Sequence, residues 1–325
     1  MKVLITRSIP SAGIDMLDAK GYEIVVNPHD RPLKKAELIS MGQGASAVIS
    51  MLTDKITRSV MKKIGPQLKI VANYAVGYDN IDVAASKKLG IHISNTPTVL
   101  TDSVAEHTIA LMMAISKRLV EADRFMRRGK YKGWKPDLLL GTEFQKKTIG
   151  VIGLGRIGKS VVRMASRAFN MQVLYQDVKR DEAFEQEYGA RYVPIEELLR
   201  SSDYVSVHVP LLESTRHLIN AEKLSMMKTS AYLINTSRGP VVDEVALYEV
   251  LEQKKIRGAA IDVFEYEPKL AGTSALTKRA RALDNLIVTP HTASATIEAR
   301  DEMARLAAQN VIAALENQLL VTPVN

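Results

Sequence analysis

Polar side chains that can move protons or bind acids follow short apolar runs in the second half of the sequence. They are His208 in VHVP, Arg238 in NTSRG, Asp262 in AIDVF with Glu267 just beyond it, and His291 in VTPH. Histidine exchanges a proton near neutral pH, and the arginine fork pairs with carboxylates. Each residue alone fits a structural role. Together, at the carboxyl ends of parallel strands, they predict a functional site at one sheet edge.

A glycine-rich segment predicts a dinucleotide site. GLGRIG (153–158) matches G-x-G-x-x-G, follows the apolar run TIGVIG (148–153) and opens a helical stretch. The first glycine allows the tight turn, the second admits a pyrophosphate, and the third lets the helix pack on the strand. The phosphates are expected at the free N–H groups of the helix start. The candidate residues are Gly153, Gly155, Arg156, Ile157 and Gly158.

Asp177 ends the next predicted strand, 19 residues after Gly158. A carboxylate at this position can accept hydrogen bonds from the ribose hydroxyls and repels a 2′-phosphate, which favours NAD over NADP. Lys179 and Arg180 lie close by in the sequence and leave room for some use of NADP. The coenzyme preference is therefore expected to favour NADH without being strict.

The composition excludes several classes of protein. The 325 residues suffice for two domains, and 46% hydrophobic and 25% charged residues are typical of a soluble globular protein. The absence of cysteine excludes thiol chemistry and favours a cytoplasmic location. No apolar run reaches the ~18 residues of a membrane span. The net charge is +8, but the basic residues are scattered, which favours small anions over nucleic acid as partners.

The elements that position these residues alternate along the chain. Short apolar runs with helical stretches between them predict parallel sheets covered on both faces. Strands are expected at 2–7, 22–27, 47–51, 69–74, 91–95, 148–153, 172–177, 204–210, 230–237, 258–264 and 286–291. Helices are expected at 11–21, 34–44, from near Thr57 and Asp82, at 156–170 and at 297–318. The fold class is therefore α/β with two doubly wound units.

One long amphipathic helix of ~27 residues is expected at 101–129, joining the two units. It has more apolar residues than are needed to line one edge of a cleft between the two units. We therefore expect it to form a homodimer interface. These residues are Val104, Ile109, Leu111, Met112, Met113, Ile115 and Leu119.

The motifs together resemble the D-isomer-specific 2-hydroxyacid dehydrogenase family over essentially the whole chain. The matching segments are NYAVGYDNID (73–82), NTPTVLTDSVAEHT (95–108), VIGLGRIG (151–158), SVHVPLLESTRHLIN (206–220), LINTSRGPVVDE (233–244), AAIDVFEYEP (259–268) and TPHTASAT (289–296). The resemblance implies a flavodoxin-like substrate domain (1–98 and 293–325) into which a Rossmann coenzyme domain (99–292) is inserted.

The resemblance implies a catalytic role for Arg238, Glu267 and His291, and the chemistry agrees. Reduction of a 2-oxo acid needs a hydride on the carbonyl carbon and a proton on its oxygen, which the His291 imidazolium can supply. Glu267 would favour the charged imidazole and orient it, and Arg238 would bind the substrate carboxylate. Val76 and Gly77 match the backbone groups that hold this carboxylate. The other histidines, His29, His92, His107 and His217, are expected to pack or to be solvated, and no metal is required.

The resemblance also implies further ligand contacts. Besides the glycine loop and Asp177, coenzyme contacts fall on Thr101, His208, Val209, Pro210, Thr215, Thr236 and Asp262, the last near the nicotinamide amide. Leu52 in MLTDKIT (51–57) matches an apolar residue against the substrate in the glyoxylate/hydroxypyruvate reductase branch. That branch often uses NADPH, with Arg where this chain has Asp177. D-lactate-type and 3-phosphoglycerate dehydrogenases remain alternatives, as does an NAD(H)-sensing corepressor of the same fold.

The only tryptophan, Trp134, lies in YKGWKPD (131–137), which has neither helical nor strand periodicity. A large aromatic side chain needs a surface to pack against. Two interpretations are open: Trp134 packs on its own coenzyme domain, or it reaches the substrate pocket of a partner subunit, as the resemblance to the reductase branch implies.

Overall fold

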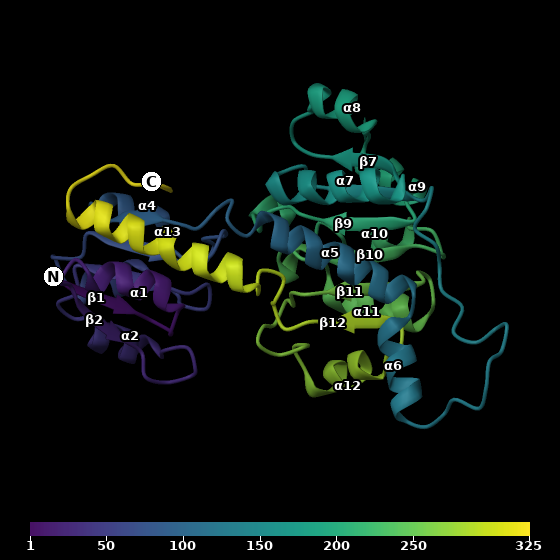
Figure 1. Ribbon diagram of the computed structural model, residues 1–325, viewed down its shortest axis with the longest axis horizontal. Coiled ribbons are helices and arrows are strands. Elements are labelled where there is room, and N and C mark those ends of the chain that lie inside the picture. The colour runs from purple at the N-terminus through teal and green to yellow at the C-terminus, as the bar shows by residue number, and fades with distance from the viewer. The chain divides into compact units, whose positions relative to one another are not determined.

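The computed structural model describes residues 1–325 and divides them into two compact units. Unit 1 comprises Met1–Leu100 and Ala295–Asn325, and unit 2 comprises Thr101–Ser294. The chain therefore leaves unit 1 once and returns to it near the end, so that the yellow C-terminal helix lies among the purple N-terminal elements (Figure 1). No helix has the length and apolar character needed to cross a membrane.

Unit 1 is built on an all-parallel sheet of five strands in the order β2-β1-β3-β4-β5. The central strands β3 and β4 are short, mostly apolar runs that are buried throughout, as expected when helices cover both faces of a parallel sheet. The strands are β1 (Lys2–Ile5), β2 (Glu23–Val26), β3 (Ala47–Ser50), β4 (Ile70–Asn73) and β5 (His92–Ser94).

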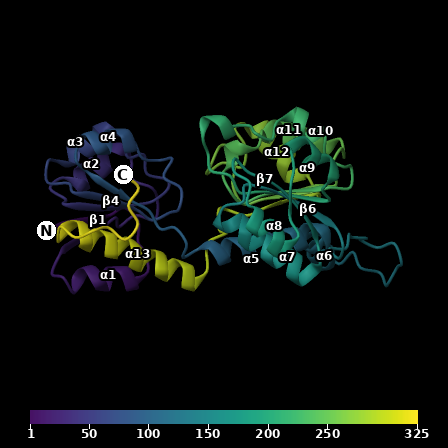
Figure 2. The same cartoon turned by 90° about the horizontal axis from the view of Figure 1, so that it is seen from above.

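Helices cover both faces of this sheet. The helices α1 (Ser11–Asp18) and α13 (Ile297–Leu315) pack together on one face, and the other three cover the opposite face (Figure 2). Those three are α2 (Lys35–Gly42), α3 (Arg58–Ile64) and α4 (Val83–Lys88). Thr57 and Asp82 cap α3 and α4 by accepting backbone N–H bonds, as their side chains favour.

Unit 2 contains an all-parallel sheet of seven strands in the order β12-β11-β10-β9-β6-β7-β8. From β6 the chain first runs outward through β7 and β8, then returns to pair β9 on the other side of β6. This reversal creates the switch point at which doubly wound folds bind ligands. The strands are β6 (Thr148–Ile152), β7 (Gln172–Gln176), β8 (Arg191–Tyr192), β9 (Tyr204–Val207), β10 (Tyr232–Asn235), β11 (Gly258–Ile261) and β12 (Leu286–Val288).

Two cores lie on the faces of the larger sheet. One is formed with α5, α7 and α8, and the other with α9, α10, α11 and α12 (Figure 2). The helices of unit 2 are α5 (Thr101–Ser116), α6 (Leu119–Arg127), α7 (Arg156–Phe169), α8 (Glu182–Tyr188), α9 (Ile195–Ser201), α10 (Ala221–Ser225), α11 (Glu244–Glu252) and α12 (Ser274–Ala282). Two short 3-10 turns, η1 (Glu213–Thr215) and η2 (Gly239–Val241), follow β9 and β10.

The expected single helix over 101–129 is wrong. Two helices, α5 and α6, occupy this range, and Arg118 between them adopts a left-handed conformation with φ 54°. The carbonyl of Ser116 accepts a hydrogen bond from Thr142 N at 2.9 Å, so a later loop caps the end of α5. The helix also does not join the units, because α5 belongs to unit 2 and packs against α7, β10 and β11.

The apolar surface expected on this helix is also mostly buried. Val104, Leu111, Met112 and Ile115 are at most 6% exposed, and the last three belong to a core of unit 2. Met113 on α5 is 37% exposed, and the most exposed apolar side chains of this part of the chain lie further along, on α6 and the loop that follows it. They are Leu119, Met126, Tyr131, Trp134 and Leu140, which we call the exposed apolar group.

Candidate active site and coenzyme site

The glycine loop turns tightly from β6 into α7. Gly153 has φ 96°, and a side chain there would place its Cβ 2.8 Å from the carbonyl carbon of His208. A Cβ on Gly158 would lie 2.1 Å from the carbonyl oxygen of Gly153. Nothing lies within 4 Å of the position of a Cβ on Gly155, so space remains at the start of α7. The loop therefore presents free N–H groups at a helix start, where anions bind.

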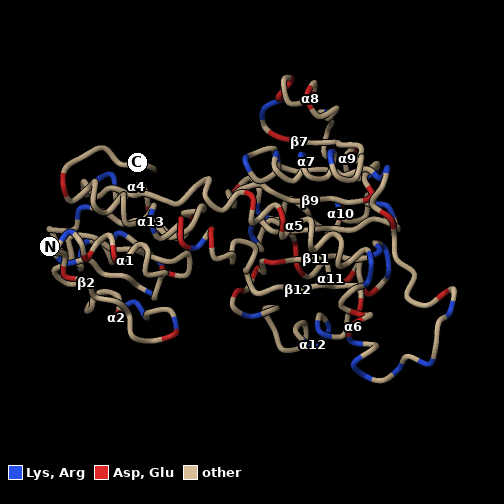
Figure 3. Tube along the Cα trace, viewed as in Figure 1, with Lys and Arg blue, Asp and Glu red and all other residues tan.

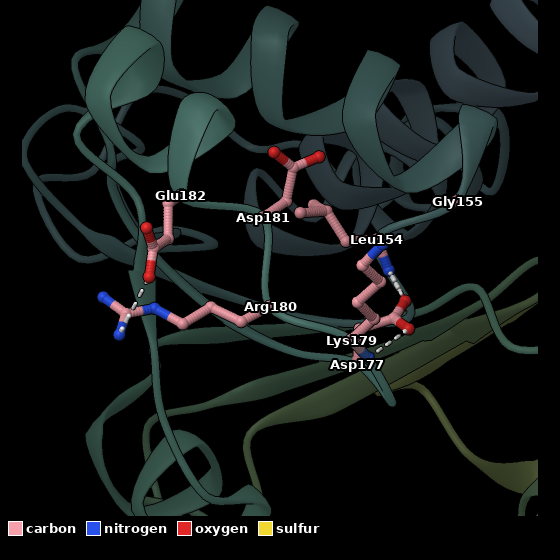
Figure 4. Close-up of a pocket in the computed structure, with 7 residues that line it drawn as sticks. All are labelled: Leu154, Gly155, Asp177, Lys179, Arg180, Asp181 and Glu182. Carbon is pink, nitrogen blue, oxygen red and sulfur yellow. Dashed lines mark hydrogen bonds and ion pairs between the residues drawn. The ribbon is translucent and has the colours of Figure 1, made fainter.

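Asp177 follows β7 and lies beside this loop. Its Oδ2 accepts a hydrogen bond from Leu154 N at 2.6 Å, while Oδ1 accepts only a long bond of 3.4 Å from Lys179 N. Asp177 thus lines a cavity of about 610 Å³ with most of the capacity of Oδ1 unused. Figure 4 shows the seven lining residues, which are Leu154, Gly155, Asp177, Lys179, Arg180, Asp181 and Glu182.

His208 follows β9 and is held in a neutral state. Its Nε2 lies 2.8 Å from the hydroxyl of Ser206, and burial lowers the pKa of the imidazole to about 4. Val209, Pro210 and Thr215, which are also predicted to contact the coenzyme, follow the same strand. The Thr215 hydroxyl donates to the carbonyl oxygen of Pro210 at 2.6 Å, which closes the loop that begins at the half-buried Val209.

Arg238 follows β10, at the point where the chain enters η2. The carbonyl of Arg238 accepts a hydrogen bond from Asn235 Nδ2 at 3.0 Å. The next residue, Gly239, lies directly against another loop, because a Cβ there would lie 1.9 Å from the carbonyl carbon of Phe264 and 2.4 Å from Glu265 N. Only glycine permits this approach, and it brings the Arg238 segment onto the loop that carries Glu267.

His291 and Glu267 form the expected pair. His291 Nδ1 lies 3.0 Å from Glu267 Oε2, and Phe264 N donates to the other carboxylate oxygen at 3.0 Å. Both side chains of the pair are partly exposed. A carboxylate on Nδ1 fixes the tautomer and the ring orientation, and leaves Nε2 for proton exchange.

Asp262 holds the segment that carries His291. The carboxylate is fully buried and accepts hydrogen bonds from Thr289 Oγ1, Thr292 N and Ala293 N at 2.5, 2.9 and 2.8 Å. Burial opposes its ionisation, but these bonds and the nearby His107, whose Nε2 lies 3.6 Å from Oδ1, outweigh it and lower the pKa of the carboxyl. Because Asp262 has no exposed surface, its contribution to the site is to hold residues 289–293 in position.

Two threonines named for the coenzyme site lie on or against α5. Thr101 is the first residue of that helix. The hydroxyl of Thr108 donates to Val104 O, so it accepts the bond at 2.9 Å from the hydroxyl of Thr236, which follows β10. Sequence reasoning passed over His107 on the same helix, although its Nε2 lies 3.2 Å from Thr289 Oγ1.

The sequence also did not indicate a network of contacts next to Glu267, which we call the relay and which consists of Glu265, Glu244 and His217. Glu265 N donates to the buried Glu244 Oε2 at 2.8 Å, and Glu265 Oε1 lies 2.9 Å from His217 Nε2. The Glu244 carboxyl also accepts a hydrogen bond from Tyr248, and burial raises its pKa. His217 was expected only to pack or to be solvated. The only sequence signal for this relay is the acidic run that contains Glu265 and Glu267.

In unit 1, Leu52 lies in the loop after β3, and Val76 and Gly77 follow β4. The carbonyl of Val76 accepts from Asn95 Nδ2 at 2.7 Å, and that of Gly77 accepts from Asn73 Nδ2 at 2.8 Å. With the carbonyls held in this way, the N–H groups of Val76 and Gly77 have no protein partner. The two asparagines were not predicted.

Trp134 lies in the loop between α6 and β6 and is 80% exposed. The interpretation in which it packs on its own coenzyme unit is therefore wrong for this structure. Its side chain is part of the exposed apolar group defined above.

The chain belongs to the family of D-isomer specific 2-hydroxyacid dehydrogenases. Residues 109–293 match the model of that family's NAD binding domain. The chain is accordingly an oxidoreductase that acts on a CH–OH group and binds NAD.

Two relatives and one solved structure illustrate the likeness. The chain is 46% identical to a glyoxylate reductase of Korarchaeum cryptofilum, over 96% of this chain and 92% of the relative. It is 43% identical to a glyoxylate reductase of Pyrococcus furiosus, over 100% and 95%. The crystal structure of the TT0316 protein from Thermus thermophilus superposes with a TM-score of 0.93 at 38% identity, covering all of both chains.

Proposed function

We propose that the chain reduces glyoxylate or hydroxypyruvate to the corresponding 2-hydroxy acid with NADH. The observation that carries this proposal is the placement of Arg238, Glu267 and His291 after three neighbouring strands, with His291 paired to Glu267 at 3.0 Å. The relatives of similar length are glyoxylate reductases, and this supports the choice of substrate.

Each catalytic side chain has a defined task in this proposal. Bound NADH supplies the hydride. His291 donates the proton to the carbonyl oxygen from Nε2, and Glu267 stabilises the imidazolium and holds its ring. The Arg238 guanidinium binds the carboxylate of the 2-oxo acid and polarises its carbonyl. These roles require that His291 Nε2 carry a proton when the hydride is transferred.

We assign the coenzyme to unit 2 and the recognition of substrate to unit 1. The free N–H groups of Val76 and Gly77 form an anion-binding pair suited to a carboxylate, and Leu52 supplies an apolar contact. In unit 2 the adenosine ribose lies at Asp177, and residues 208–210 with Thr215 form the wall of the adenosine part. Thr101, Thr236 and Asp262 support the nicotinamide end, the last through residues 289–293.

A preference for NADH over NADPH follows from Asp177. The Asp177 carboxylate, held by Leu154 N, would accept a bond from a ribose hydroxyl and repel a 2′-phosphate. Replacing it by Ala is expected to raise the use of NADPH relative to NADH. An unchanged ratio of kcat/KM values for the two coenzymes would contradict this assignment.

The function is tested by following NADH oxidation with a panel of 2-oxo acids. We expect the highest kcat/KM with glyoxylate or hydroxypyruvate, and lower values with pyruvate, bulky 2-oxo acids and phosphohydroxypyruvate. A maximum with pyruvate would identify a D-lactate-type enzyme, and one with phosphohydroxypyruvate a phosphoglycerate dehydrogenase. Binding of NADH and peptides without turnover of any acid would support a corepressor instead.

We propose a cytoplasmic homodimer. The exposed apolar group on α6 and the following loop supports self-association, because such side chains gain by burial in an interface. In Figure 3, Lys and Arg are interspersed with Asp and Glu in both units, which supports attraction of small anions rather than a nucleic-acid interface. Light scattering at micromolar concentration tests the dimer, and a monomer mass would contradict it.

A further inference from the structure

Arg180 is the only guanidinium that lines the Asp177 cavity, and two glutamates hold it. Its Nε and Nη2 donate to Glu185 Oε1 and Oε2 at 2.9 and 2.8 Å, and its Nη1 lies 3.8 Å from Glu182 Oε1. In Figure 4 the Arg180 side chain extends toward Glu182 and away from Asp177. A bidentate pair of this kind fixes the orientation of the guanidinium as well as its charge.

Glu185 is itself held in place. The hydroxyl of Tyr175, a fully buried residue, donates to Glu185 Oε1 at 2.8 Å and accepts from Asp181 N at 2.8 Å. The pairing with Arg180 lowers the pKa of the Glu185 carboxyl and raises that of the guanidinium, so both groups are charged at neutral pH. The Arg180 guanidinium is thus bound by the carboxylate of Glu185 on α8, which is itself bound by Tyr175 on β7.

The other cations near the cavity are a paired lysine and an unpaired one. Lys159 Nζ forms an ion pair with Asp181 at 2.6 Å, and Lys179 has no ion pair. An extra phosphate on the ribose would therefore meet the Asp177 carboxylate, one flexible lysine, and an arginine whose donors are already engaged. Lysine is a point charge on a mobile stem, whereas the arginine fork matches phosphate with two bonds.

We propose that Glu185 is a residue that determines coenzyme specificity, because it withholds the Arg180 fork from a ribose 2′-phosphate. This inference rests on the proposed function, in which the cavity receives the adenosine ribose. Discrimination against NADPH then has two parts, which are repulsion by Asp177 and engagement of Arg180 by Glu185.

The two parts are coupled. If Glu185 alone loses its charge, the released guanidinium has Asp177 as a new partner at the same cavity and gains little for a phosphate. If Asp177 is neutral as well, the phosphate becomes the best partner for Arg180. The effect of Glu185→Gln on NADPH binding must therefore be larger in an Asp177→Asn background than in the wild type, which a double-mutant cycle measures.

The experiment compares wild type, Asp177→Asn, Glu185→Gln and the double variant. The dissociation constants of NADH and NADPH, and of adenosine 2′,5′-bisphosphate and AMP, are measured at one fixed salt concentration. We expect Glu185→Gln to tighten NADPH about tenfold in the Asp177→Asn background, less than about threefold in the wild type, and to leave NADH unchanged. Adding Arg180→Gln to the double variant should reverse the gain.

Glu187→Gln provides a charge-matched control. Glu187 lies on the same helix and pairs with Arg167 at 3.2 Å on an exposed surface, so its loss changes the net charge equally without releasing Arg180. An equal gain of NADPH affinity with Glu187→Gln would overturn the proposal, as would an absence of effect of Glu185→Gln in the Asp177→Asn background.

Arg180→Lys in the Asp177→Asn background tests the same idea with Glu185 left in place, should Glu185→Gln impair folding. A lysine cannot form the bidentate pair, so we expect tighter NADPH binding than with Asp177→Asn alone, and unchanged or weaker binding would contradict the proposal. The outcomes separate the two hypotheses. Wild-type protein that does not bind NADH overturns the proposed function itself, whereas normal NADH binding without the coupled effect overturns only the role of Glu185.

Discussion

At the scale of single residues, the proposed acid depends on an unusual backbone. His291 has φ 54°, a left-handed conformation that is uncommon for residues other than glycine. His291 N donates to Asp262 O at 2.8 Å and to Thr289 O at 3.0 Å, and the ring is bound to Glu267. The ring position is thus determined by a backbone carbonyl and a carboxylate of the segment that follows β11, together with its own strand end.

Replacing His291 by Gln is expected to reduce kcat by about 10²–10⁴, which is the usual contribution of a positioned acid. Glutamine retains a hydrogen-bond donor but cannot carry the transferred proton. The dissociation constant of NADH should change less than about twofold, because the coenzyme binds at the glycine loop. Steady-state rates and nicotinamide fluorescence measure the two quantities, and substantial residual turnover would remove His291 from the role of acid.

His208 should make stability depend on pH. Burial lowers its pKa to about 4 from 6.5, so between these values the unfolded chain binds a proton that the folded chain lacks. The contribution is complete above pH ~6.5 and is lost as the pH falls toward ~4. Because His208 as a whole residue keeps some solvent exposure, we expect a loss of about 1–2 kcal/mol.

Urea unfolding at pH 7 and pH 4.5 measures this loss. Wild type should lose more free energy of unfolding between the two pH values than His208→Gln, whose side chain does not titrate. An identical pH dependence in both proteins would show that other groups account for it.

At the scale of elements, the site is made by loops that touch one another after parallel strands. Gly239 lets the loop after β10 lie against Phe264 and Glu265 in the loop after β11. The backbone N–H of Glu265 donates to Glu244 on α11, and the Glu265 carboxylate contacts the His217 ring. The backbone N–H of His217 donates to Pro240 O at 2.8 Å. The positions of Arg238 and Glu267 are therefore coupled through backbone contact.

Gly239→Ala tests this coupling. Its Cβ must push the two loops apart, so we expect a loss of about 1–3 kcal/mol in stability together with a fall in kcat. Gly129→Ala is the matched control, since Gly129 has φ 64° and open space around it. The control should lose stability without losing kcat. Equal kinetic effects from both substitutions would contradict a specific role for the Gly239 contact.

The sequence predicted strands and helices well where a single hydrophobic pattern determined them. The buried apolar runs mark each observed strand of three or more residues, although the strands end one to three residues earlier than expected. The helix over 101–129 was wrong because amphipathic periodicity continues through Arg118, whereas the break is imposed by a distant contact, Thr142 on Ser116. The helices α8–α12 were not placed from the sequence, although they are about as long as α1–α4.

The residues of the candidate site also differ in how well the sequence indicates them. Parallel topology places residues after successive strands at one edge, so the strand ends indicated Arg238, Glu267 and His291 among other polar residues, and the family resemblance selected these three as catalytic. Their supporting partners, such as Glu244, His107 and Asn95, come from helices and loops whose packing no local pattern specifies. Each is an ordinary polar residue in the sequence and is recognised only by the atom that it contacts.

At the scale of the whole molecule, the exposed apolar group sets an expectation about assembly. Trp134 is 80% exposed in a segment without regular structure, and four more large apolar side chains of the group lie on α6 and the same loop. A surface of this kind favours association, since aromatic side chains contribute strongly when an interface buries them.

Trp134→Ala is expected to raise KM for hydroxypyruvate or alter the preference among 2-oxo acids, while leaving NADH affinity unchanged. The reason is that, in the proposed dimer, Trp134 contacts the substrate site of the partner subunit. Trp134→Phe, which keeps an aromatic ring, should restore most of the wild-type KM. Unaltered kinetics in Trp134→Ala, whatever the change in thermal stability, would contradict a contact with the partner's substrate site.

The placement of α13 in unit 1 has a consequence for synthesis on the ribosome. Its buried face packs against α1, β3, β4 and β5, yet about 200 residues of unit 2 are made between those strands and this helix. At about 5–20 residues per second, the first 100 residues wait tens of seconds for their last layer. Unit 2, whose sequence is continuous, can complete its core first. The order of folding is then the reverse of the order in which the units begin, and the exposed face of the first sheet is where a nascent chain would need protection.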